Sequence, residues 1–345
     1  MSLAAQVLEG NRLALARLLT KIENNEPEGK AALNELFPHT GKAHLIGVTG
    51  APGTGKSSLV NRLALYYRKL PAEQIRPVAI VAVDPSSPFT GGAILGDRVR
   101  MRDLAGDPGV FIRSMASRGS LGGLAAATSG MVQALDAGGF EIILIETVGA
   151  GQAEVDIARL AHTTLVIEAP GLGDDIQAIK AGILEIADIL VINKADRPGV
   201  EITERALRSM LELAHPAPRI FHNHAHQFSH TEQAENLHSE GKTNGDEPFW
   251  QTPILKTVAI EGEGILELGM AIAEHVHFLK DSGQYAQREK ARLQSELNVL
   301  LQETLVSRWR SQVTKDAYRR VLDRLMLRRL SPYQAVDVLL DGGET

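Results

Sequence analysis

Short, almost continuous apolar runs mark the chain between residues 44 and 258. Two of them, Ile142-Ile143-Leu144-Ile145 and Ile189-Leu190-Val191-Ile192, contain no polar residue. Half-exposed strands alternate apolar and polar residues, whereas strands of a parallel sheet that is covered on both faces are apolar throughout. The pattern therefore predicts strands of a buried parallel sheet over His44–Thr49, Pro77–Val83, Val110–Arg113, Glu141–Glu146, Thr163–Glu168, Asp188–Asn193 and Pro253–Val258.

Segments with apolar residues at helical spacing lie between the predicted strands. Alternating strands and helices are typical of an α/β domain with a doubly wound, mostly parallel sheet, which we expect over residues 43–280. A helical lead-in is expected over residues 1–42, with one helix over 3–22 and a short second helix over 31–36. We interpret this lead-in as a packing element.

The strand pattern ends at residue 281, and a helical arm is expected over residues 281–345. Its helices are predicted over 288–309 and 314–330, with Ser331 and Pro332 opening a last one. The leucines of the arm exceed what the sheet needs to cover it. This excess favours an arm that joins two copies of the chain.

Composition excludes several classes of protein. The 345 residues are 44% hydrophobic and 23% charged, with a formal net charge of −6 and no long basic block, so no nucleic-acid partner is expected. There is no cysteine, and no apolar run approaches the roughly 20 residues of a membrane helix. The first ten residues lack the features of a signal peptide. We expect a cytoplasmic protein without a membrane partner.

Gly50-Ala51-Pro52-Gly53-Thr54-Gly55-Lys56-Ser57 has the spacing G-x-x-x-x-G-K-S of a phosphate-binding loop, between a predicted strand and a predicted helix. The glycines let the backbone bend round a polyphosphate, and the N–H groups of the loop and helix start face the anion. Lys56 is expected to reach the β- and γ-phosphates, and the Ser57 hydroxyl to bind Mg²⁺. The predicted phosphate-binding residues are Gly50, Ala51, Pro52, Gly53, Thr54, Gly55, Lys56, Ser57 and Ser58.

Acidic residues follow two of the predicted strands. Asp84 comes directly after Val83, where it could meet Mg²⁺ or a water near the γ-phosphate, or simply open a turn. Glu146 ends a strand before a glycine turn, the usual place of a metal-binding carboxylate and phosphate sensor. Gln152 lies three residues after Gly149 rather than directly after it, so we expect slow hydrolysis by the free protein.

Two loops are predicted to change with the bound nucleotide. The glycine-rich segment 91–102, which contains Asp97, is pliable and carries charges of both signs. The segment 169–180 follows another strand and contains Asp174, Asp175 and Lys180. Asp174 or Asp175 could equally cap the next helix, and a cap and a switch are compatible.

Asn193-Lys194-Ala195-Asp196 follows an apolar strand downstream of the phosphate loop. N-K-x-D in this position reads guanine, because the carboxylate of Asp196 can accept hydrogen bonds from N1–H and the exocyclic amine, a pair that adenine lacks. Asn193 is expected to bond along the base edge and to the phosphate loop, and the Lys194 stem to lie over the ring. Backbone N–H groups at Thr257, Val258 and Ala259 are expected to complete the base contacts. The bound nucleotide is therefore predicted to be GTP or GDP.

Together these motifs resemble the MeaB/ArgK family of P-loop GTPases, over roughly residues 3–340. The resemblance implies a GTPase chaperone that gates cobalamin loading and protects or reactivates an adenosylcobalamin-dependent acyl-CoA mutase such as methylmalonyl-CoA mutase. It also implies slow GTP hydrolysis that the mutase stimulates, a homodimer joined by the C-terminal arm, and a third switch at 174–180. The residues that match the family's Mg²⁺ and switch positions are Ser57, Asp84, Asp97 and Glu146. The predicted catalytic set is Lys56, Asp84, Asp97 and Glu146.

A polar, histidine-rich segment over residues 215–247 reads as an insertion loop. Spaced histidines can bind nickel, copper or zinc, so a second interpretation is a metallochaperone GTPase that delivers nickel or zinc to an apo-enzyme. The absence of cysteine and the switch sequences oppose it. A nucleotide-binding regulatory module without turnover is a third interpretation.

Overall fold

The computed structural model describes residues 1–85, 102–104, 106–117, 123–147, 153–171, 185–213 and 248–341. Within these ranges the strands form one seven-stranded sheet in the order β3-β2-β4-β1-β5-β6-β7, and every neighbouring pair is parallel. The predicted doubly wound α/β fold is confirmed. The strands are β1 (His44–Gly50), β2 (Val78–Pro85), β3 (Val110–Ser117), β4 (Ile142–Thr147), β5 (Thr163–Glu168), β6 (Ile189–Asn193) and β7 (Ile254–Thr257).

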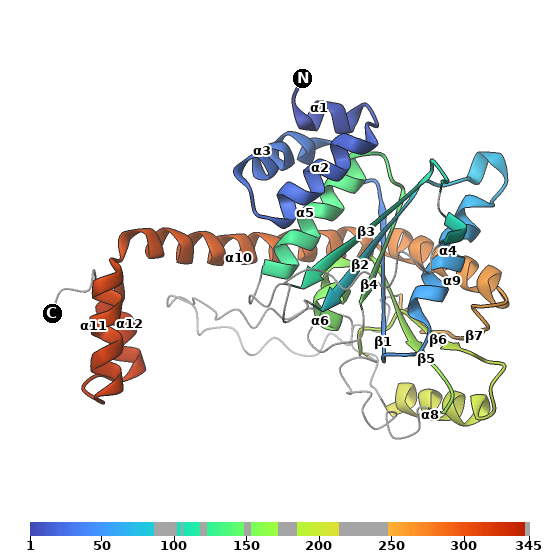
Figure 1. Ribbon diagram of the computed structural model, residues 1–345. Helices are drawn as coiled ribbons and strands as arrows, with labels where there is room; N and C mark the ends of the chain where they lie inside the picture. Colours follow the sequence, from blue (N-terminus) through green and yellow to red (C-terminus); the bar gives the residue numbers. More distant parts are fainter. Residues whose placement is uncertain are drawn as a thin grey trace, which may run out of the picture.

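Helices cover both faces of the sheet. Successive residues of a strand point to opposite sides, so strands that are apolar throughout place apolar side chains on both faces. Ile46 and Val48 of β1 belong to a core shared with α4 (Lys56–Arg68) and α9 (Ile265–Asp281). Leu45 belongs to the opposite core, with α5 (Gly123–Ala137) and α6 (Ala153–Leu160). Figure 1 shows these two layers of helices on either side of the strands. A further helix, α8 (Val200–Leu213), packs against β6 and β7.

Helix α6 lies very close to β1 at Gly47. A Cβ atom built there would lie 2.6 Å from Cγ2 of Ile157 and 3.1 Å from Cβ of Ala161. Contacts this short exclude any side chain, so the glycine sets how near α6 approaches the central strand.

The lead-in forms three helices rather than the predicted two: α1 (Leu3–Leu8), α2 (Arg12–Glu23) and α3 (Pro27–Leu36). The prediction of one helix over 3–22 is wrong because the chain turns at Gly10, which has φ +81°. Asn11 then begins α2, its side-chain Oδ1 accepting hydrogen bonds from the N–H groups of Leu13 and Ala14. Leu18 and Leu19 of α2 are buried in the same core as the strands, so the lead-in is part of the layer on the α5 face.

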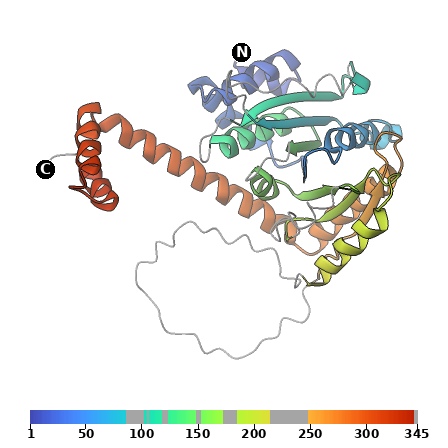
Figure 2. The ribbon, with the colours of Figure 1, turned by 60° about the horizontal axis from the view of Figure 1, so that its bottom comes forward.

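The arm begins with α10 (Gln284–Gln312), followed by α11 (Lys315–Met326) and α12 (Pro332–Leu340). Figures 1 and 2 show α10 crossing the body and then projecting from it, with α11 and α12 at its far end. Ser331 and Gln334 form a reciprocal capping box at the start of α12, as the Ser-Pro signal predicted. Across the described ranges, no helix combines the length and apolar character that crossing a membrane requires.

A buried polar cluster fixes the base of the arm to the sheet. Arg288 of α10 donates two hydrogen bonds of 3.0 Å to the carboxylate of Asp188, which is 2% exposed. Asp188 also accepts a 2.8 Å bond from the N–H of Thr164 and lies 3.2 Å from Nε2 of His275. The arm is thus held by charges that are almost removed from water.

A second ion pair lies beside this cluster, between Glu289 and Arg292 of α10. Burial alone would raise the pKa of Glu289, but hydrogen bonds from Arg292 and His162 lower that pKa to about 2. Burial lowers the pKa of His162 below its usual value, despite the hydrogen bond to Glu289 that opposes this shift. Glu289 is therefore an anion at neutral pH, held beside the arginine of its own helix.

Candidate functional site

The candidate site lies where β1 runs into α4, at the carboxyl edge of the sheet. Gly53 and Gly55 have φ values of +82° and +92°, which L side chains rarely adopt. A Cβ on Gly55 would lie 2.4 Å from Nδ2 of Asn193, and one on Gly50 would lie 2.1 Å from the carbonyl oxygen of Ile167. The glycines are therefore required both by the path of the loop and by the residues packed against it.

Helix α4 starts at Lys56 without a side-chain cap among the described residues. The N–H groups of its first turn have no partner within the helix and carry its positive dipole end, so they suit an anion. Lys56 is 5% exposed, and its Nζ donates bonds of 2.9 Å to the carbonyls of Gly50 and Ala51. The start of α4 and the side chain of Lys56 thus place positive charge at the same short loop.

Ser57 and Glu146 meet beside this loop. The Ser57 hydroxyl donates a 2.6 Å hydrogen bond to Oε1 of Glu146, whose residue is 3% exposed at the end of β4. A hydroxyl and a carboxylate side by side are the oxygen ligands that Mg²⁺ prefers. These residues therefore fit a Mg²⁺ ion next to bound phosphates.

Of the other two predicted acids, Asp84 and Asp97, the structure describes only the backbone of Asp84. The backbone of Asp84 belongs to β2, one residue beyond Val83, which pairs with Thr147 of β4, so it reaches the same edge of the sheet as Glu146. The side chain of Asp84 lies outside the described part of the chain, as do Asp97, Gln152 and the residues from 172 to 184.

The N-K-x-D segment contacts the phosphate loop directly. Nδ2 of Asn193 donates a 2.8 Å bond to the carbonyl of Thr54, and Nζ of Lys194 donates a 2.5 Å bond to that of Gly53. Lys194 has φ +58°, which turns the chain after β6. Asp196 is exposed, which leaves its carboxylate accessible to a ligand.

The segment after β7 completes this side of the site. Oδ1 of Asn193 accepts hydrogen bonds of 3.1 Å from the Thr257 hydroxyl and from the N–H of Ala259. Both ends of the Asn193 amide are thereby fixed, which aligns the base-reading segment with the phosphate loop. The structure brings together three segments that lie about 140 and 60 residues apart in the chain, as the bonds from Asn193 to Thr54 and to Thr257 span 139 and 64 residues.

The prediction missed Arg62. From the second turn of α4, its Nε donates a 3.0 Å bond to the carbonyl of Ala259, and its guanidinium also bonds to that of Ile260. The sequence shows only an arginine at a helical position six residues after Lys56, and no local pattern links it to a segment nearly 200 residues away. The prediction also missed the hydrogen bond that the Thr257 hydroxyl donates to Asn193, because these residues are likewise far apart in the chain.

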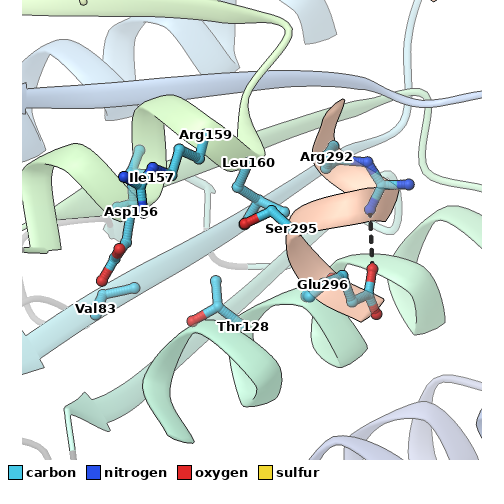
Figure 3. Close-up of a pocket in the computed structure, with 10 residues that line it drawn as sticks. Val83, Thr128, Asp156, Ile157, Arg159, Leu160, Arg292, Ser295 and Glu296 are labelled. Atoms are coloured by element: carbon cyan, nitrogen blue, oxygen red, sulfur yellow. Dashed lines mark hydrogen bonds and ion pairs between the residues drawn. The ribbon is translucent and has the colours of Figure 1, made fainter. Parts of the chain in front are cut away.

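A separate cavity of about 50 Å³ lies on the opposite face, between α5, α6 and the base of α10 (Figure 3). Val83, Ile157 and Leu160 supply apolar walls, and Arg292 and Glu296 approach from α10, joined by the dashed contact in the figure. None of the predicted site residues lines it. The cavity is therefore not the nucleotide site.

The histidine-rich segment lies outside the described residues, which resume at Pro248. Within the described ranges, no group of three or more His, Cys, Asp or Glu side chains could hold a metal ion.

A parallel sheet with a G-x-x-x-x-G-K-S loop and an N-K-x-D segment bonded to that loop defines a P-loop GTPase. Residues 15–314 match the family model described as methylmalonyl Co-A mutase-associated GTPase MeaB. The chain belongs to the MeaB family.

The chain is also similar in sequence and in structure to individual known proteins. The chain is 40% identical over 339 residues to a GTPase of Pyrococcus horikoshii, covering 98% of this chain and 96% of that protein. It is 29% identical to the mitochondrial methylmalonic aciduria type A homolog of Mus musculus, over 97% of this chain and 77% of that protein. A solved structure described as an LAO/AO transport system kinase superposes with a TM-score of 0.65 at 25% identity, covering 98% and 95% of the two chains.

Proposed function

We propose that this GTPase is a chaperone of an adenosylcobalamin-dependent acyl-CoA mutase such as methylmalonyl-CoA mutase. In this proposal it gates loading of the cobalamin cofactor and protects or reactivates the mutase. The observation that carries the proposal is the match of residues 15–314 to a family described by its association with that mutase. In this proposal the GTP-dependent switch is carried by the predicted loops 91–102 and 174–180, which, apart from residue 102, lie outside the described residues.

Each part of the site has a proposed role in binding GTP. The loop from Gly50 to Ser58 holds the phosphates through its N–H groups, and Lys56 offsets their negative charge. Ser57 and Glu146, together with Asp84 and Asp97, hold Mg²⁺, which when bound would offset charge on the β- and γ-phosphates. Asn193, Lys194 and Asp196 read the base, with Thr257, Val258 and Ala259 closing around it.

We further propose that the free protein hydrolyses GTP slowly. Gln152 lies two positions further from Gly149 than a water-orienting glutamine directly after that glycine would. A mutase that binds the productive arrangement of the acidic loops preferentially would raise the rate by shifting the population of that arrangement. A shift from 1:99 to 99:1 needs about 5.5 kcal/mol of differential binding, which a protein interface can supply.

Base selection is tested by Asp196→Asn. The variant is expected to bind GDP roughly 10- to 100-fold more weakly, because it loses hydrogen bonds to a charged acceptor. It should bind xanthosine diphosphate more tightly than the wild type does, since xanthine carries oxygen where guanine carries an amine. Titration with fluorescent nucleotides measures both affinities. Glu201→Gln, which removes a nearby exposed charge, is the control. Equal affinity of the wild type for ADP and GDP would overturn the assignment of the base site.

Partner stimulation is tested by single-turnover GTP hydrolysis with and without a cobalamin-dependent mutase from the same genome. We expect the mutase to accelerate the wild type. Asp174→Ala and Lys180→Ala in the proposed third switch should lose most of this stimulation and keep nucleotide affinity and the basal rate. Glu73→Ala is the control, because it removes an exposed acid from the short helical turn Ala72–Gln74 that precedes β2. A fast basal rate without response to the mutase would contradict the proposal.

We also propose that the arm joins two copies of the chain. Leu297, Leu301 and Leu305 of α10 are 64%, 53% and 56% exposed in the single chain. Apolar side chains in a row on a projecting helix mark an interaction surface. A second copy, which brings the same row, can cover them by a symmetric contact.

The double substitution Leu301→Glu with Leu305→Glu is therefore expected to convert a dimer to a monomer, because it places charges in the apolar contact. Arg310→Glu changes the net charge by the same amount at an exposed position on the opposite side of the same helix, nine residues from Leu301, and should stay dimeric. Light scattering measures the mass of each. A leucine variant that stays dimeric would exclude this face of the arm as the interface.

A further inference from the structure

Two buried threonines join the strand that carries Glu146 to the strand that enters the phosphate loop. Thr147 is the last residue of β4, and Thr49 is the last but one of β1. The Thr147 hydroxyl donates a 3.1 Å hydrogen bond to the Thr49 hydroxyl. Thr49 is 0% and Thr147 1% exposed, so the bond is shielded from water.

This bond lies just where the backbone pairing of the two strands stops. The last paired residues of β1 and β4 are Val48 and Glu146. One residue further, Thr49 is still paired with Val166 of β5, and Thr147, the last residue of β4, with Val83 of β2, but the two threonines are no longer paired with each other through the backbone. The hydroxyl pair therefore continues the attachment of the two strands by one residue, at the point where the site begins.

Glu146 and Thr147 act on opposite faces of the sheet. Side chains of consecutive strand residues point to opposite sides. Glu146 points to the α4 side, where Ser57 donates to its carboxylate at 2.6 Å, and Thr147 points to the other side, where it reaches Thr49. The end of β4 is thus held on one face by the first turn of α4 and on the other by the residue before the loop.

Packing alone does not require hydroxyl groups here. Valine has nearly the same volume as threonine, and neighbouring buried positions of these strands, such as Val48 and Ile145, are apolar. A buried hydroxyl is costly unless it is hydrogen-bonded. The hydrogen bond between the two threonines offsets that cost and fixes the distance between the ends of β1 and β4.

We propose that Thr49 and Thr147 are positioning residues that set the distance between the Glu146 carboxylate and the phosphate loop. Through this distance they control how Mg²⁺ and the phosphates are held together during hydrolysis. The inference rests on the proposed role of Ser57 and Glu146 in binding Mg²⁺, and it goes beyond that role by assigning the support of the metal site to the hydroxyl pair.

The test compares Thr147→Val, which removes the bond, with Thr147→Ser, which keeps a hydroxyl. For each we would measure thermal stability, GDP affinity in EDTA, the Mg²⁺ concentration that gives half-maximal hydrolysis, and the single-turnover rate. Thr147→Val is expected to raise the half-maximal Mg²⁺ concentration and lower the rate by about tenfold each, because small misplacements of catalytic groups are costly. GDP affinity in EDTA should change by less than about twofold for this lost contact outside the loop.

The serine variant should restore both Mg²⁺ dependence and rate to within about threefold of wild type, since it keeps the bond. Thr49→Val should reproduce the valine effect, and the double valine variant should be no worse than either single one, because both remove the same interaction. If Thr147→Val does not fold, Thr49→Val and Thr49→Ser give the same comparison.

Three outcomes would overturn the inference: unchanged Mg²⁺ dependence in Thr147→Val, no recovery with serine, or additive losses in the double variant. Glu146→Gln and Ser57→Ala separate this failure from failure of the metal site itself. If both of these shift the Mg²⁺ dependence and Thr147→Val does not, only the role of the threonines is wrong. If neither shifts it, the proposed metal site is wrong as well.

Discussion

Lys56→Ala is expected to lower the rate of GTP hydrolysis by roughly 100- to 1,000-fold, as does loss of a group aimed at charge that develops in a transition state. The Nζ of Lys56 is held over the phosphate loop by the carbonyls of Gly50 and Ala51. Removing it takes away the loop's own lysine, where the loop must bind a polyanion. Loss of a charge-assisted bond worth about 1.5–3 kcal/mol should also weaken GTP binding by roughly 10- to 150-fold.

Single-turnover hydrolysis at saturating GTP, and titration with a non-hydrolysable GTP analogue, measure these two effects. Lys69→Ala is the matched control, because Lys69 is an exposed lysine at the other end of the same helix. It should hydrolyse GTP at the wild-type rate. A Lys56→Ala variant that did the same would show that the loop is not the active site.

Asp188→Asn is expected to reduce the free energy of unfolding by about 3–5 kcal/mol, the usual effect of breaking a buried ion pair. The change removes the charge that Arg288 and the Thr164 N–H face, and leaves the guanidinium of Arg288, which is 14% exposed, without this carboxylate. Since Arg288 belongs to the first turns of α10, the base of the arm should loosen first.

Chemical denaturation at one fixed protein concentration measures the effect, because association of the arms would otherwise change apparent stability. Glu141→Gln is the control. It breaks the ion pair with Arg76, whose side chains are 44% and 49% exposed, and should cost less than about 1 kcal/mol. If Asp188→Asn costs no more than Glu141→Gln, the buried cluster does not anchor the arm.

The sheet could be predicted from the sequence because its signal is local. Runs such as Ile142–Ile145 are apolar throughout only where both faces are covered, and each ends at a polar motif. The order of those motifs also predicted the family, and Asn193 was expected to bond to the phosphate loop, as its bond to Thr54 now shows.

Other features depend on residues far apart in the chain. Arg288 reads as one polar position on a helix, and its partners, Asp188 and the carbonyl of His162, lie 100 and 126 residues earlier. Thr147 looks like any polar residue in a glycine turn until Thr49 is placed beside it. The break at Gly10 had a local signal, but the apolar stripes of α1 and α2 obscured it.

The central claim is that nucleotide state and mutase binding are coupled. By linkage, a mutase that stimulates GTP hydrolysis by selecting one conformation must bind the GTP and GDP forms with different affinities. Isothermal titration of the mutase with this protein, in the presence of Mg²⁺ and either GDP or a non-hydrolysable GTP analogue, measures that difference directly. We predict affinities that differ at least fivefold, the lower end of typical coupling. Equal affinities, or no binding in either state, would contradict the proposed function.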